Sequence, residues 1–279
     1  MDILLMIKAA ILGVIEGVTE FLPISSTGYL ILSADVLDFW SKDKRDLFIV
    51  LIQLGAIFAV IYEYFGRLYH AFLGLVIGKA EGMDKPRQLG INLIVATIPV
   101  MAMGLLLADK IGVLFHPLLV ATMLIVGALL IIYVERNPSP IVAHKAETIT
   151  MKTAIAIGLC QCLALLPGTS RSGATIIGGV YFGVSKKAAT EFSFFLGIPV
   201  IIGAGLLDVL KYHHVLSSGQ DWLVLIVGAL VSFVVALFGI RWLVAWVADK
   251  DLMLFAYLRI VTGLVVMIAY FVFGYHLDG

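Results

Sequence analysis

The chain has 279 residues, of which 61% are hydrophobic and 14% charged, and its mean hydropathy is +1.07. This is far more apolar surface than one soluble core can bury, so the composition indicates a polytopic membrane protein and excludes an ordinary soluble domain. The formal net charge is zero and the basic residues are scattered, which excludes a nucleic-acid-binding surface.

The apolar segments fall into two kinds, because a helix needs about 20 apolar residues to cross the hydrocarbon core. Segments broken by Gly, Pro, Ser and Thr are expected to form re-entrant helix pairs, which are tolerated at membrane depth only where their free backbone groups face protein or water. In chain order the pattern predicts a broken segment at 4–38, spans at 47–65, 89–108 and 117–134, a second broken segment at 151–184, and spans at 190–211, 222–247 and 253–275.

The order of these elements repeats, which predicts an all-α membrane protein of two repeats, 1–140 and 141–279. An offset of 145 aligns Gly13 with Gly158, Glu16 with Gln161, Ser25 with Ser170, Thr27 with Ser172 and Gly28 with Gly173. Each repeat has three spans, an odd number, so the second must be inverted relative to the first. Broken segments at corresponding positions of inverted repeats indicate a site near the middle of the membrane.

Two carboxylates, Glu16 and Glu20, stand in the first broken segment. They are four residues apart, so on a helix they share a face and repel each other. Such a pair is tolerable if one carboxyl is protonated or if a cation is present, and Mg²⁺ or Ca²⁺ would suit these hard ligands. The alternative is that each carboxyl simply hydrogen-bonds to a neighbouring helix.

The two helix breaks have the composition of an anion-binding site. The first reads Pro-Ile-Ser-Ser-Thr-Gly at 23–28, and the second reads Pro-Gly-Thr-Ser-Arg-Ser-Gly-Ala-Thr at 167–175. Unpaired backbone N–H groups, a helix N-terminus and the guanidinium of Arg171 are what a phosphate group requires. Alternatively, the hydroxyls only cap helices, and Arg171 forms a structural ion pair with Glu16 or Glu20.

Lys and Arg in short loops predict the orientation. They are more frequent on one side of the spans, which is expected to be cytoplasmic; examples are Arg67, Arg136, Lys186 and Arg241 on that side, against Lys8, Lys44 and Lys211 on the other. Both termini and the Glu16 segment would then approach from outside.

Over essentially its whole length the chain resembles the undecaprenyl-diphosphate phosphatases, also called bacitracin-resistance proteins. The resemblance rests on the stretches 16–28 and 167–175. It implies a multi-pass enzyme of the bacterial inner membrane with interlocked inverted repeats, often a homodimer, whose site opens to the periplasm. Its substrate would be a prenyl diphosphate lipid, hydrolysed to undecaprenyl phosphate and inorganic phosphate for cell-wall synthesis with the help of a divalent cation.

The resemblance also implies roles for individual residues. Glu16 and Glu20 match the acidic motif and would bind the cation, Ser26 matches the serine proposed as nucleophile, and Arg171 matches the arginine that holds the diphosphate. Further substrate-binding positions are Ser25, Thr27, Tyr29, Ser170, Ser172 and Thr175.

Tyr29 departs from the family pattern, which often has a histidine there. A phenol with a pKa near 10 is a poor base at neutral pH. We therefore expect Glu20 to activate Ser26, unless the chain is impaired. Attack by metal-bound water, with Ser26 only positioning the phosphate, remains an alternative.

A lipid-phosphate transporter or flippase is the competing hypothesis, because inverted repeats with broken helices are also a transporter architecture. A structural scaffold is a third alternative, but it would leave the two carboxylates and Arg171 without a reason.

Overall fold

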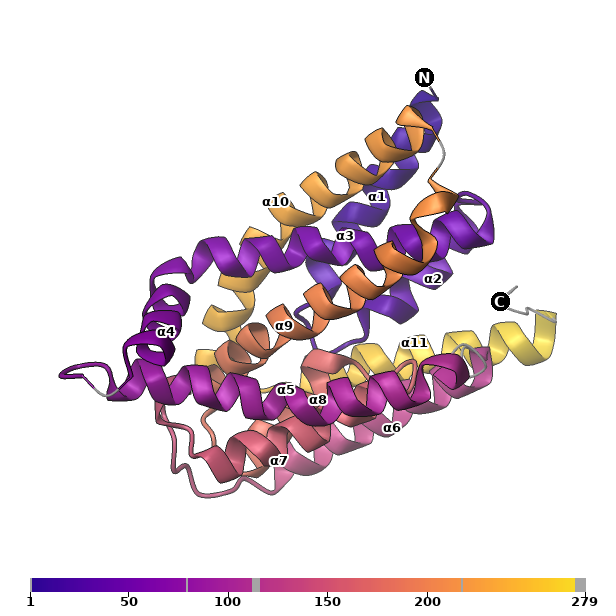
Figure 1. The fold of residues 1–279 in the computed structure, drawn as a ribbon. Helices are drawn as coiled ribbons and strands as arrows, with labels where there is room; N and C mark the ends of the chain where they lie inside the picture. Colours follow the sequence, from indigo (N-terminus) through magenta and orange to yellow (C-terminus); the bar gives the residue numbers. More distant parts are fainter. Residues whose placement is uncertain (1, 79, 112–115, 217, 274–279) are drawn as a thin grey trace.

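The computed structural model describes residues 2–78, 80–111, 116–216 and 218–273, which form helices and no strand (Figure 1). The all-α class is therefore confirmed. The α-helices are α1 (Ile3–Thr19), α2 (Ser26–Val36), α3 (Lys42–Glu63), α4 (Phe65–Ile77), α5 (Asp84–Ile111), α6 (Pro117–Arg136), α7 (Met151–Gln161), α8 (Arg171–Tyr181), α9 (Lys186–Tyr212), α10 (Gly219–Asp249) and α11 (Met253–Phe273). Three short 3₁₀ turns are η2 (Ala146–Thr148), η3 (Cys162–Leu165) and η4 (His213–Val215).

In the part of the chain that the structure describes, six helices are long and apolar enough to cross a membrane: α3, α5, α6, α9, α10 and α11. They coincide with the six predicted spans, although several begin at polar residues that the apolar pattern left out. α9 begins early because Ser185 caps it by accepting from the backbone N–H of Ala188. α10 begins behind a capping box formed by Ser218 and Asp221. The predicted end of the last span at 275 lies outside the described residues.

The two broken segments each fold as a pair of short helices joined by an irregular loop. Residues 20–26, here called the first loop, connect α1 to α2 and include the first residue of α2. Residues 162–171, the second loop, connect α7 to α8 and include the first residue of α8. The four helices have 11 to 17 residues, fewer than the roughly 20 needed to span a bilayer. In Figure 1, α1 and α7 approach from opposite ends of the bundle. Their re-entrant placement in a bilayer stays a prediction.

The halves of the chain interlock through these short helices. α1 packs along α10, and α7 packs along α5, so each short helix lies against a span from the other half. Glycines allow the close approach: a Cβ at Gly13 would lie 2.5 Å from the carbonyl oxygen of Gly228, and one at Gly158 would overlap the carbonyl of Ala96. Both loops are thereby carried into the interior of the bundle.

The spans that correspond in the two halves are α3 and α9, α5 and α10, and α6 and α11. The two members of each pair run in opposite directions in Figure 1. α3 contacts α9, and α6 contacts α11, so two of the three pairs pack against each other. This arrangement agrees with inverted repeats. The division at residue 140 stays a prediction.

Helix α4 has no counterpart among the predicted elements. It follows α3 after a break at Tyr64 and lies across one end of the bundle, packed on α5 (Figure 1). Its 13 residues are too few for a span, and its apolar and polar residues alternate with a helical period that the search for long apolar runs does not detect.

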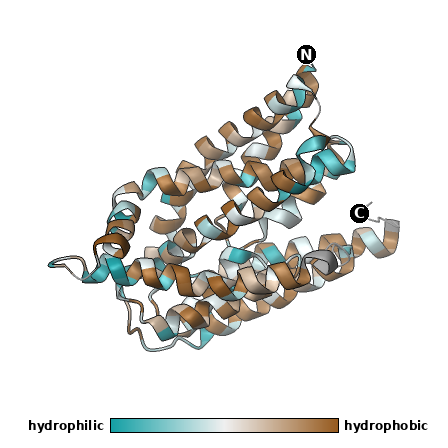
Figure 2. Ribbon diagram, in the orientation of Figure 1, coloured by the Kyte–Doolittle hydropathy of each residue, from teal (hydrophilic) through white to brown (hydrophobic). Residues whose placement is uncertain are grey.

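Polar residues gather at the two ends of the molecule, and apolar residues cover the length of the bundle (Figure 2). One end is tied by the ion pair of Lys44 with Asp221. At the end that carries α4, Lys186 pairs with Glu135 and Arg241 with Glu63. The polar ends and the apolar sides are those of an integral multi-pass membrane protein.

Candidate active site

A cavity of about 230 Å³ lies where the two loops meet. It is closed laterally by the middle of α5 and the second half of α9. Six of the residues proposed from the sequence line it, together with two glutamines: Glu20, Ser25, Ser26, Thr27, Ser170, Arg171, Gln53 and Gln161.

The backbone of both loops turns sharply just before a helix begins. Ser25 precedes α2 with φ 79° and ψ 81°, and Ser170 precedes α8 with φ 71° and ψ 117°. A positive φ is costly for a residue other than glycine and is concentrated at functional sites. The two serines are the ones that the repeat aligns, so the same strained turn occurs in both halves and brings helix N-termini to the cavity.

Glu20 joins residues from the two loops. Ser26 donates a hydrogen bond from Oγ to Glu20 Oε2 at 2.6 Å, and Arg171 donates from Nη2 to Glu20 Oε1 at 3.1 Å. Glu20 and Ser26 are buried, with 6% and 8% of their surfaces exposed. A carboxylate in this position can accept the hydroxyl proton of Ser26 while a fixed cation holds it in place.

Arg171 is oriented by α9 as well as by Glu20. Its Nη1 donates to the backbone carbonyl of Ser193 at 2.9 Å, and its guanidinium lies over Gly197, where a Cβ would come within 2.7 Å of Nη1. Its Nε is buried and has no hydrogen-bond partner within the described ranges. The guanidinium therefore keeps donor capacity for an anion at the cavity, next to the N-terminus of α8, where Ser170 Oγ accepts from Gly173 N–H.

Glu16 is fully buried, and neither of its carboxylate oxygens has a hydrogen-bond partner among the described residues. Glu20 and Arg171 are the charged groups that act on it. A buried carboxylate without a partner is costly, and a cation shared with Glu20 would remove that cost. Within the described ranges, no three His, Cys, Asp or Glu side chains are placed so that they could hold a metal ion together. The donor set suits Mg²⁺ or Ca²⁺, since two carboxylates with neutral oxygens are ligands that these ions accept.

Gln161 is a cavity residue that the sequence did not identify as part of the site. It is fully buried and lines the cavity, and in the part of the chain that the structure describes neither polar atom of its amide has a partner. Its alignment with Glu16 across the repeat was the available signal. Gln161 offers an amide donor and an acceptor where Glu16 offers only a carboxylate.

Three of the proposed hydroxyls lie away from the cavity. Ser172 donates to the backbone carbonyl of Leu22 at 2.8 Å, which ties the second motif to the first loop. Thr175 pairs with Ser193 Oγ at 2.6 Å and ties α8 to α9. The hydroxyl of Tyr29 is 2.6 Å from Thr262 Oγ1 on α11. These contacts hold the loops in place and leave no donor aimed at the cavity from these side chains.

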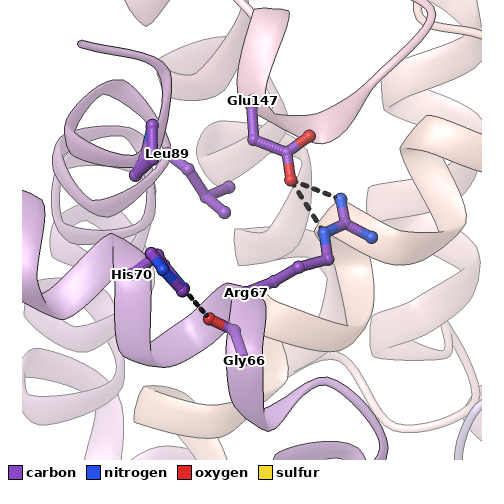
Figure 3. A pocket seen from close by; sticks show the side chains of 6 residues that line it. Gly66, Arg67, His70, Leu89 and Glu147 are labelled. Atoms are coloured by element: carbon purple, nitrogen blue, oxygen red, sulfur yellow. Dashed lines mark hydrogen bonds and ion pairs between the residues drawn. The ribbon is translucent and has the colours of Figure 1, made fainter. Parts of the chain in front are cut away.

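A smaller cavity, of about 140 Å³, lies beside α4 and is lined by Arg67, His70 and Glu147 (Figure 3). Arg67 donates to Glu147 and to Glu191, so its charge is already paired. Burial works to lower the pKa of Arg67, but the two carboxylates hold it above its usual value. The ion pairs of Arg67 therefore tie α4 to η2 and to α9 beside this cavity.

Comparison with known proteins identifies close relatives over the whole chain. The family model described as bacitracin resistance protein BacA matches residues 9–265. A protein named undecaprenyl-diphosphatase from Psychrobacter sp. is 65% identical over 283 residues and one from Psychrobacter cryohalolentis is 63% identical over 280, each covering 100% of both chains. One named undecaprenyl-diphosphatase 1 from Acinetobacter baylyi is 56% identical over 96% of this chain and 97% of its own.

Proposed function

Since the chain belongs to the bacitracin resistance protein BacA family, we propose that the cavity between its two loops is the place where it hydrolyses undecaprenyl diphosphate. The protein is a membrane phosphatase. Relatives that are 63–65% identical to it over the full chain are named undecaprenyl-diphosphatase. Water and undecaprenyl diphosphate give undecaprenyl phosphate and inorganic phosphate. The monophosphate is thereby returned for use as a carrier lipid.

The contact that supports this site best is the chain from Ser26 through Glu20 to Arg171. It places a hydroxyl, a base and a cation from both loops at one cavity wall. Phosphoryl transfer asks mainly for positioning and for neutralisation of phosphate charge, and these three groups offer both. A transport site would need the cation but would have no use for a hydroxyl held by a carboxylate.

In the proposed reaction, Arg171 and the N-terminus of α8 bind the oxygens of the terminal phosphate while the prenyl chain stays in lipid. Ser26 Oγ attacks the terminal phosphorus in line, and its proton passes to Glu20 and from there to the departing undecaprenyl phosphate. Water then attacks the phosphoserine, and Glu20 takes up a proton from this water and returns it to Ser26 Oγ as the bond between phosphorus and Oγ breaks. Phosphate is released with Ser26 and Glu20 restored.

Glu16 and Glu20 would hold the divalent cation, Mg²⁺ or Ca²⁺. The ion would neutralise charge on the phosphate groups when it is bound. The two unpartnered oxygens of Glu16 support this assignment. Gln161 would supply a neutral oxygen or an amide donor beside it.

Glu20 is the proposed base because Tyr29 is engaged elsewhere. The phenol points to Thr262 and does not line the cavity. Tyr29 therefore does not take over the role of the histidine that is often found at this position in the family. Glu20 already accepts from the nucleophile, so the reaction needs no further group for that proton.

The site is proposed to face the periplasm. The cavity is lined by Val100, Val200 and Ala204, which lie in the middle of α5 and the second half of α9, toward the end of the bundle opposite α4. The α4 end carries the larger share of Lys and Arg, and this excess supports the proposal that the α4 end is cytoplasmic.

The test is phosphate release from undecaprenyl diphosphate by purified protein in detergent, for wild type, Ser26→Ala and Ser33→Ala, each with and without EDTA. We expect release by wild type and by the Ser33→Ala control, loss with EDTA, and loss by Ser26→Ala. Ser33 lies on α2 as Ser26 does but does not line the cavity. Full release by Ser26→Ala would remove the serine nucleophile, and absence of release by wild type under all conditions would favour a lipid-phosphate transporter.

A further inference from the structure

Arg259 is a fully buried arginine in α11, and among the described residues it forms no ion pair. All its hydrogen bonds go to backbone carbonyls. Nε donates to Leu124 at 3.1 Å, Nη1 to Pro23 at 3.1 Å, and Nη2 to Met123 and Gly168 at 3.0 Å each. One guanidinium therefore holds four carbonyl groups from three segments.

Two of these carbonyls belong to the loops that form the active site. Pro23 lies in the first loop and Gly168 in the second, whereas the other two carbonyls lie on α6. Gly168 lines the cavity, but Arg259 does not. Arg259 thus fixes the separation of the loops from behind, on the side away from the substrate.

The space for this side chain is provided by glycine. A Cβ at Gly127 on α6 would overlap Nη2 of Arg259, and a Cβ at Gly173 on α8 would lie 3.4 Å from Nη1. The guanidinium is therefore confined on one side by α6 and on another by the first turn of α8. In this position the guanidinium forms all four hydrogen bonds.

Burying this cation without a carboxylate is costly in a membrane protein, because carbonyl dipoles replace only part of the lost hydration. An apolar residue of similar volume would fill the same space without that cost. The charge is nevertheless useful beside a cavity that receives a diphosphate, because its field is not cancelled by a neighbouring anion and the low dielectric weakens it little.

We propose that Arg259 is a positioning residue of the phosphatase reaction: it holds the two loops at the separation at which Ser26 and Arg171 address one phosphate group, and its unpaired charge strengthens binding of the diphosphate. This inference rests on the proposed active site. It assigns two measurable contributions to one side chain. The fork of donors acts on kcat through loop geometry, and the charge acts on KM.

The experiment measures kcat and KM for phosphate release by Arg259→Lys, Arg259→Met and Gly127→Ala, together with the thermal midpoint of each purified protein. Arg259→Lys keeps the charge but cannot bridge both loops, so kcat falls by about 100-fold while KM stays near wild type. Gly127→Ala displaces the guanidinium and gives the same pattern. Arg259→Met loses both contributions, so its kcat falls and its KM rises.

Arg241→Met is the matched control, because Arg241 is 60% exposed and pairs with Glu63 at the α4 end; its kcat and KM stay at the wild-type values. Wild-type kcat in Arg259→Lys, or wild-type KM in Arg259→Met, would overturn the inference. The inference would also be overturned if the loss of activity in each variant were fully explained by a smaller amount of folded protein. If Arg259→Met does not fold, Arg259→Gln, which also removes the charge, takes its place for KM, and Arg259→Lys and Gly127→Ala decide the effect on kcat. Ser26→Ala, measured in parallel, tests only the nucleophile. Its result therefore distinguishes failure of the proposed active site from failure of the inference about Arg259.

Discussion

Glu20 uses its two carboxylate oxygens for two different tasks. Oε2 accepts from the hydroxyl of Ser26, and Oε1 accepts from Arg171 on the opposite loop. The arginine fixes the carboxylate, so the hydroxyl meets a base of defined orientation. The proposed nucleophile and the proposed phosphate-binding arginine are therefore coupled through one side chain.

Replacing Glu20 by glutamine tests its role as the base. Glu20→Gln keeps the shape of the side chain and can still accept from Ser26, but it cannot take up the proton. We expect kcat to fall by about 10²- to 10⁴-fold with the protein still folded. The measurement is phosphate release at saturating substrate, with Glu63→Gln at the α4 end as the control; equal kcat in Glu20→Gln and wild type would contradict the role.

The sequence identified the residues of the cavity better than the direction of their side chains. Glu20, Ser26 and Arg171 stand out as polar groups within broken apolar segments, and the structure brings them together. Where a hydroxyl points depends on partners that are distant along the chain. Tyr29 faces Thr262, 233 residues away, and no local pattern contains that contact.

At the scale of the helices, close packing of α1 on α10 carries the first loop to the interior. Gly17 lies against Ser232 and Val235, and a Cβ there would come within 2.7 Å of the Ser232 carbonyl oxygen. α1 carries Glu16 and ends next to Glu20. The packing of α1 on α10 therefore determines how far into the bundle both carboxylates lie.

A pair of glycine substitutions tests this packing. Gly17→Ala places a methyl group against backbone, and overpacking of this kind costs about 1–3 kcal/mol. Gly66→Ala in the first turn of α4 is the matched control, because among the described residues nothing beyond its own helix backbone and chain neighbours lies within 4 Å of a Cβ built there. In thermal unfolding in detergent, Gly17→Ala should have the lower midpoint; equal midpoints would argue against the close contact.

The elements that the sequence predicted are those with long apolar runs or with clear helix breakers. The six spans and the two loops belong to these classes. Helix α4 was missed because its apolar residues cover one face only, and the early start of α9 was missed because a cap at Ser185 extends the helix into polar sequence. The short pairs owe their position to contacts with the other half, which only the tertiary structure provides.

At the scale of the whole molecule, the two ends differ in what they hold. The α4 end carries the ion pairs of Arg67, Lys186 and Arg241, and the opposite end carries the N-terminus and the loop between α2 and α3. The cavity lies toward this second end. The membrane orientation therefore decides which compartment supplies the substrate headgroup.

Two cysteine variants test that orientation in cells whose protein also carries Cys160→Ser and Cys162→Ser. Ser41→Cys lies at the end toward which the cavity faces, and Lys145→Cys lies at the α4 end; both positions are exposed. A membrane-impermeant maleimide should label Ser41→Cys in intact cells and Lys145→Cys only after permeabilisation. The reverse pattern would place the site on the cytoplasmic side.

The stereochemical course at phosphorus distinguishes a covalent phosphoserine at Ser26 from direct attack by water. The substrate is a prenyl diphosphate whose terminal phosphorus carries sulfur and two different oxygen isotopes, and the reaction is run in water of the third oxygen isotope. The measurement is the configuration of the released chiral thiophosphate. Two successive in-line displacements, first by Ser26 and then by water, predict retention of configuration. Inversion would mean a single displacement by water and would contradict the covalent role of Ser26.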